Sequence, residues 1–154
     1  MTQKGSTNRS GTMNCWNLTY NDPGRWEEVY AICGRPISFL KGIMQGGTGS
    51  PRGVLIDVPG ESASQLLETS NIKYCNFQRT EKGAILFFKV RLEVYGIPIR
   101  ETDVISIRLE QRKTDAFKHA IILMLGNGKH IEIATQQDKQ GAWEKFLKSC
   151  FVRL

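Results

Sequence analysis

The chain has 154 residues, of which 40% are hydrophobic and 23% are charged. This composition supports one globular domain with a buried core and excludes a wholly disordered chain. The formal net charge of +6 is spread evenly, since residues 1–60, 61–118 and 119–154 each contribute +2, and no apolar run reaches the roughly 18 residues of a membrane span.

Residues 1–12 are polar and lack the apolar centre of a signal peptide, so we expect a soluble, cytoplasmic protein. In that compartment cysteines are buried apolar residues more often than disulfide partners. The four cysteines form no CxxC pair, and they are accompanied by only two histidines, His119 and His130. The sequence therefore predicts no zinc site and no cofactor.

Residues 1–20 are predicted to form a flexible tail, because they are rich in Ser, Thr, Gly and Asn. A short helix is expected next, capped by Asp22 and ended by Gly34 and Pro36. Apolar residues recur along it at helical spacing: Trp26, Val29, Tyr30 and Cys33. Trp26 and Tyr30, together with Trp16, are candidate partner contacts, with the alternative that they cover an exposed edge of the domain.

The glycine-rich segment Gly46–Gly53 is predicted to be a linker at the end of an N-terminal helical or irregular extension, residues 21–53. A phosphate-binding loop would be followed by a helix. Here the residues that follow, Val54–Val58, have the pattern of a strand. The β-rich domain is therefore expected to span residues 54–154.

Within that domain, apolar residues mostly alternate with polar ones, which is typical of half-buried strands. A short helix is predicted at Ser62–Thr69, and Gly96 with Pro98 allows a bend. The expected strands are Val54–Val58, Ile72–Phe77, Phe88–Val94, a continuation at Ile97–Ile99, and Ile105–Glu110.

The C-terminal third contains the clearest local signals. Asn127-Gly128 separates Ala120–Leu125 from the alternating residues around Ile131 and Ile133, which predicts a hairpin with a type I′ turn. A helix is expected from Asp138 to Phe151. Its apolar residues all fall on one face that must dock on the sheet: Ala142, Trp143, Phe146, Leu147, Cys150 and Phe151.

Strands followed by one C-terminal amphipathic helix over residues 54–154 resemble the pleckstrin-homology-like (PH-like) superfold. The features that carry the resemblance are Asp103–Ile107, the hairpin at Asn127-Gly128, and Trp143 in the terminal helix. The resemblance implies a mainly β (α+β) fold, a bent antiparallel sheet or partly open barrel capped by the helix. The segment Ser62–Thr69 departs from it, because it interrupts the first hairpin.

Members of that superfold bind phosphoinositides, peptides or other proteins, so the resemblance implies binding rather than catalysis. Lipid-binding members carry a basic cluster between their first two strands. The corresponding loop here carries Glu61 and Glu68 and gains no arginine before Lys73, which disfavours phosphoinositides and leaves an anionic lipid surface weakly supported. We therefore expect a non-catalytic module that binds another protein through a sheet edge or loop surface.

The alternative is a nucleic-acid-binding module that uses a basic sheet face. In this hypothesis Lys89 and Arg91 share one strand face, Arg108 lies on the corresponding face of a nearby strand, and Phe77 or Tyr95 stacks on bases. Further candidate contacts are Arg100, Arg112, Lys113 and Lys118. Glu93 and Glu110 oppose this alternative, because they occupy the same faces and would pair with the cations. A small enzyme is less favoured still, because neither histidine belongs to a catalytic constellation.

Overall fold

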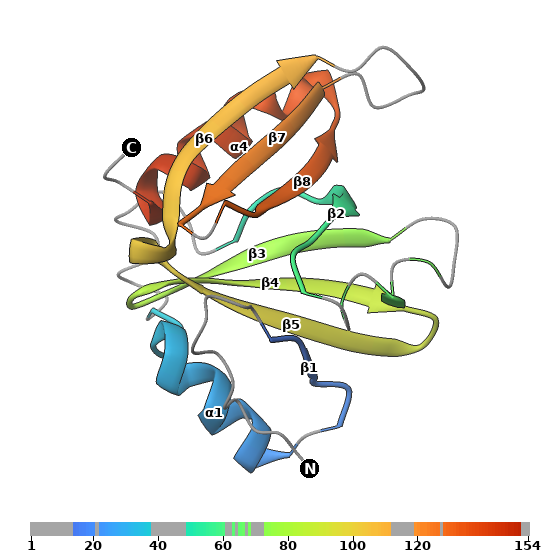
Figure 1. The fold of residues 1–154 in the computed structure, drawn as a ribbon, viewed down its shortest axis with the longest axis vertical. Coiled ribbons are helices and arrows are strands. Elements are labelled where there is room, and N and C mark those ends of the chain that lie inside the picture. Colours follow the sequence, from blue (N-terminus) through green and yellow to red (C-terminus); the bar gives the residue numbers. More distant parts are fainter. Residues whose placement is uncertain are drawn as a thin grey trace.

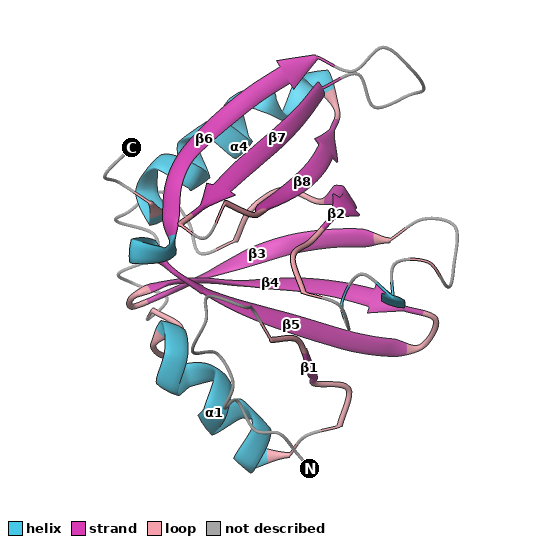
Figure 2. Ribbon diagram, in the orientation of Figure 1, coloured by secondary structure: helices cyan, strands magenta, loops and turns pink. Residues whose placement is uncertain are grey.

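The computed structural model describes residues 14–20, 22–37, 49–60, 63, 65–66, 68, 73–111, 119–126 and 128–151. These residues form a mainly β structure, an antiparallel sheet of eight strands that does not close, with a helix at its C-terminal end (Figures 1 and 2). The predicted mainly β class and C-terminal helix are confirmed. No helix of the described residues is long and apolar enough to cross a membrane.

The strands follow the order β1-β5-β4-β3-β2-β8-β7-β6 across the sheet. Their bounds are β1 Trp16–Asn17, β2 Gly53–Asp57, β3 Tyr74–Thr80, β4 Gly83–Val90, β5 Glu93–Arg100, β6 Val104–Gln111, β7 His119–Leu125 and β8 His130–Thr135. The two helices that matter here are α1, Pro23–Cys33, and α4, Gln140–Cys150. Residues 63, 65 and 66 are helical, as predicted for Ser62–Thr69, and residue 68 lies in a turn, whereas the other residues of 61–72 lie outside the described residues.

Helix α4 lies behind β6, β7 and β8 in Figure 1, and aromatic side chains on its buried face also contact β3. The ring of Trp143 is fully buried and meets Phe77 of β3 edge-on, with ring centroids 6.0 Å apart. Phe146 stacks on the same phenylalanine at 6.2 Å. The same cluster includes Ile121 of β7 and Ile133 of β8. At about 25 cal/mol per Å² of apolar surface, burying these side chains stabilises the fold by several kcal/mol.

A tight turn divides the residues that the period-two pattern assigned to one strand, Phe88–Val94. Strands β4 and β5 pair in register up to Val90 opposite Glu93, which leaves Arg91 and Leu92 at the tip of the turn. Arg91 has a φ of 59°, and the Leu92 side chain is 87% exposed. The prediction was wrong because such turns are usually marked by Asn or Gly, and here an arginine takes the left-handed conformation.

Gly96 and Pro98 do not interrupt the strand, since β5 runs through both residues and pairs with β4 along its whole length. Proline is tolerated in this strand because β1 pairs only with Tyr95 and Gly96, so Pro98 lies where β5 is an edge. A single turn of 3₁₀ helix at Glu101–Asp103 then leads into β6, where the two halves of the sheet diverge.

The predicted hairpin of β7 and β8 is confirmed, with Met124 opposite His130. Leu125 N–H donates to the carbonyl of Lys129 at 2.8 Å, so residues 126–128 connect the strands. This connection is longer than the two-residue type I′ turn that was predicted. Gly128 takes the positive φ expected of it, 83°, and residue 127 lies outside the described residues.

The N-terminal extension packs on the outer face of β4 and β5. Asp22 caps α1 by accepting a hydrogen bond from Gly24 N–H at 2.9 Å, and Gly34 ends the helix with a φ of 87°. A second apolar cluster lies between this extension and the sheet: Trp16, Leu18, Val29, Cys33 and Ile85. Residues 14–20 of the predicted tail form β1 and the start of the link to α1, whereas residues 1–13, 21 and 38–48 lie outside the described residues.

Candidate interaction surface

Strand β6 is the last strand of the sheet and pairs on one side only. Its pairing with β7 extends from Val104 opposite Leu125 to Gln111 opposite His119. No strand of the described residues pairs with its other side. An unpaired strand edge presents a row of backbone donors and acceptors on which a further strand can add. We call this side of β6 the open edge.

Apolar side chains lie along the open edge. Ile105 is 60% exposed and Leu109 is 42% exposed, although their two-residue spacing from Ile107 predicts that all three lie on one buried face. Ile107 itself packs against the core cluster that contains α4. A register shift between Val104 and Ser106 places Ile105 at a bulge, which twists the strand locally. The open edge is therefore apolar on the side of the core.

The opposite face of β6 is charged. Arg108 and Glu110 form an ion pair with an N–O distance of 3.1 Å, and both side chains are about half exposed. An exposed pair of this kind contributes at most about 1 kcal/mol. The predicted neutralisation of Arg108 by Glu110 is confirmed. The open edge thus has one apolar and one charged face.

The other edge of the sheet, at β5, is covered by the chain itself. Trp16 and Asn17 of β1 lie opposite Gly96 and Tyr95, and Leu18 N–H continues the ladder by donating to the carbonyl of Val94 at 2.8 Å. We call residues 14–34 the N-terminal cover. Within this cover, β1 adds to the edge of β5 as a strand from the same chain.

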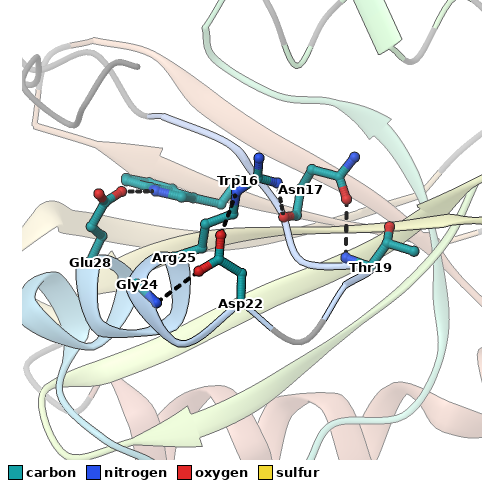
Figure 3. Close-up of polar contacts among 7 residues, drawn as sticks. All are labelled: Trp16, Asn17, Thr19, Asp22, Gly24, Arg25 and Glu28. Carbon is teal, nitrogen blue, oxygen red and sulfur yellow. Dashed lines mark hydrogen bonds and ion pairs between the residues drawn. The ribbon is translucent and has the colours of Figure 1, made fainter. Parts of the chain in front are cut away.

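Polar contacts hold the N-terminal cover together (Figure 3). The indole N–H of Trp16 donates to Glu28 of α1 at 2.7 Å, and Arg25 donates to the backbone carbonyl of Asn17 at 2.8 Å. Thr19 N–H donates to the side chain of Asn17 at 3.0 Å. These bonds tie β1 to α1, so that the strand and the helix cover β5 and β4 as one unit.

Of the aromatic residues predicted as partner contacts, Trp16 is buried, and Trp26 and Tyr30 are half-buried in the N-terminal cover. The ring centroids of Trp26 lie 5.6 Å from Tyr30 and 6.1 Å from Phe87 on β4. Arg35 lies over the Tyr30 ring at 5.1 Å. The structure therefore places all three residues where the alternative reading expected them, against an edge and outer face of the sheet.

The basic residues predicted to form one face are dispersed. Lys89 lies on β4, Arg91 lies in the turn after it, and Arg108 lies on β6, with β3, β2, β8 and β7 between β4 and β6 in the sheet. The expectation that Arg108 stands on a nearby strand is wrong, because strand order is set by long-range pairing. Arg100 is paired with Asp103 at 3.0 Å. Arg112, Lys113 and Lys118 lie outside the described residues.

The predicted base-stacking residues are engaged inside the protein. Phe77 is fully buried beneath α4, so it cannot stack on a base. Tyr95 is half-buried, stacks on Phe88 with centroids 5.7 Å apart, and donates its hydroxyl proton to Glu93 at 2.8 Å. Glu93 therefore bonds to a tyrosine rather than to Lys89 or Arg91 as expected.

The described histidines and cysteines lie on different elements of the fold. His130 Nε2 lies 3.3 Å from Asp57 Oδ2 beside an open cavity of about 570 Å³, whereas His119 begins β7. Burial raises the pKa of the Cys75 and Cys150 thiols to about 12, so both are protonated at neutral pH. Among the described residues, no three His, Cys, Asp or Glu side chains gather as a metal site would require.

Comparisons of the chain with protein-family models, with curated proteins and with solved structures find no match. Within the described residues, the two edges of the sheet differ, since β5 is covered by β1 and β6 is open.

Proposed function

We propose that the protein is a non-catalytic interaction module and that an extended segment of another protein adds to the open edge of β6. The observation that carries the proposal is the unpaired side of an eight-residue strand bearing exposed Ile105 and Leu109. In strand addition, backbone hydrogen bonds provide affinity and alternate side chains provide specificity.

The order of the strands supports the PH-like assignment proposed for residues 54–154. From β5 to β2 the strands are consecutive neighbours, β2 then pairs with β8, and β8, β7 and β6 complete the sheet. The helix α4 follows the last strand and packs into the core. This arrangement agrees with a bent antiparallel sheet capped by a terminal helix, a superfold whose members bind peptides and proteins.

The two faces of β6 indicate the chemistry of the partner segment. Side chains alternate along a strand, so every second residue of an added strand lies beside Ile107 and Leu109 on the core side. Those residues of the partner are expected to be apolar. The residues between them lie beside Arg108 and Glu110 and are expected to be polar or charged.

The test is affinity capture of the full chain and two variants from native lysate, with and without nuclease. Leu109→Lys places a charge on the apolar side of the open edge, and Leu92→Lys makes the same change at the exposed β4–β5 turn. We expect a protein partner that survives nuclease, is lost with Leu109→Lys and is retained with Leu92→Lys.

Capture that is indifferent to Leu109→Lys contradicts the proposal. Capture that disappears on nuclease treatment in the unmodified protein would instead support the nucleic-acid alternative, which the dispersed cations now disfavour.

A further inference from the structure

A small polar pocket lies on the sheet away from the open edge. It has a volume of about 340 Å³ and is formed where the start of β2 meets the start of β3 and the link from β8 to α4. Its lining residues are Pro51, Arg52, Gly53, Tyr74, Gln136 and Lys139. In the sheet, β8 and β7 separate β2 from β6, so this site is independent of the proposed strand addition.

The charge of the pocket is one-sided. Arg52 and Lys139 both line it, and no carboxylate is among the lining residues. Elsewhere on the described surface, several cations have a carboxylate within 4.0 Å: Arg25, Arg35, Arg100, Arg108 and Lys148. In the same described ranges, neither Arg52 nor Lys139 forms such an ion pair. Among the described residues, the two positive charges therefore have no carboxylate partner, and both face a pocket that an anion can enter.

A cation–π contact holds one of these cations at the pocket. The guanidinium carbon of Arg52 lies 4.3 Å from the centroid of the Tyr74 ring. A cation–π contact of this length restrains the guanidinium beside the ring. A planar fork of donors held in this way matches two oxygens of a phosphate or carboxylate.

The composition of the pocket selects among anions. Two cations favour a dianion over a monoanion, because each additional unit of ligand charge interacts with both. The Gln136 amide adds hydrogen-bonding groups, and the volume falls at the small end of the range for small-molecule pockets. We propose that this pocket binds the phosphate group of a small phosphate monoester, with Arg52 and Lys139 as its charged contacts.

The test is a titration of the isotopically labelled full chain with phenyl phosphate at constant ionic strength, followed by NMR. The proposal predicts saturable shifts of the amide signals of Gly53, Tyr74, Gln136 and Lys139. Benzoate, which carries the same ring and a single negative charge, is expected to bind more weakly. Absence of saturable shifts at these amides, or binding of benzoate as tight as that of phenyl phosphate, overturns the proposal.

Variants locate the binding within the pocket. Arg52→Ala is expected to weaken phenyl phosphate binding about ten-fold, and Lys139→Gln less, since only arginine offers the bidentate fork. Arg35→Ala is the matched control, because Arg35 also lies over a tyrosine but is paired with Glu27 at 2.9 Å. If Arg35→Ala and Arg52→Ala weaken phenyl phosphate binding equally, the loss comes from the lower net charge alone, and the assigned site is wrong.

Discussion

The two edges of the sheet are treated differently by this chain. At β5, the N-terminal cover adds a short strand and packs a helix beside it. At β6, the described residues add nothing, and the strand carries only a bulge and the Arg108–Glu110 pair, features that discourage indiscriminate edge pairing. The sheet can therefore accept an added strand at an edge, because β1 of the same chain adds to β5.

Strands β4 and β6 differ in how their outer faces are covered. On β4, Ala84 and Leu86 face the core, while Ile85 is buried on the other face beneath α1, so the strand is apolar on both faces. On β6, Arg108 and Glu110 remain exposed. Helix α1 covers the outer face of β4, which therefore carries buried hydrophobic residues on both faces, whereas the outer face of β6 keeps the charged residues of a half-solvated strand.

The largest expected effect concerns the core beneath both edges. Trp143→Ala should lower the free energy of unfolding by about 3–5 kcal/mol, because a fully buried ring that bridges the halves of the sheet is replaced by a cavity. Chemical denaturation measures this change. Trp26→Ala, which truncates a half-buried ring in the N-terminal cover, should cost less, and an equal or larger loss would show that the cover contributes as much as the core.

A change within the N-terminal cover should affect the stability of the β5 edge more than that of the β6 edge. Val29 is fully buried between α1 and the sheet, so Val29→Ala should cost about 2 kcal/mol. Hydrogen exchange should accelerate at Val94 and Gly96 of β5 more than in β6. Uniform acceleration across the chain would mean that the cover and the sheet unfold as one unit.

Alkaline pH should weaken the core gradually. The Cys75 thiol has its pKa raised from 9.0 to about 12 by burial, so the folded chain keeps a proton that the unfolded chain releases. This contribution to stability is complete below pH 9 and is lost as the pH rises toward 12, at about 1.4 kcal/mol per pH unit for one such group. Denaturation at several pH values measures the slope, which should be shallower in Cys75→Ala. An unchanged slope would assign the loss to other groups.

The smallest expected effect lies at the turn between β4 and β5, away from the open edge. Arg91→Gly should stabilise the protein by about 0.5 kcal/mol, because the strain of a left-handed arginine exceeds the extra backbone entropy of glycine. Thermal denaturation detects the change, with Lys89→Gly on β4 as a control that should destabilise. A destabilising Arg91→Gly would show that the arginine side chain has a compensating contact.

Local signals predicted local structure well. Asp22 and Gly34 bound α1 as expected, Gly128 turns the last hairpin, and the apolar face of α4 is buried as its spacing requires. Each of these features depends on residues near one another in the sequence. The β4–β5 turn carries no such local signal. Its left-handed residue is an arginine, at φ 59°, and the alternation of apolar residues continues through the turn.

The candidate site depended on information that the sequence pattern does not hold. Ile105, Ile107 and Leu109 predict one buried face, but only the strand order reveals that β6 is an edge and that two of these side chains are exposed. The proximity of Arg52, Tyr74 and Lys139 likewise depends on pairing across the sheet. The sequence pattern also predicts Lys89 and Arg108 on nearby strands. Long-range pairing instead places four strands between β4 and β6 in the sheet.

If β6 is the binding edge, hydrogen exchange should differ along this strand between the free protein and its complex with the captured partner. Strand addition predicts slower exchange on binding at amides within Ile105–Gln111, with little change at Val94–Gly96 beneath the N-terminal cover. Protection that appears at the β5 edge or in the N-terminal cover, and leaves β6 unchanged, would contradict the account.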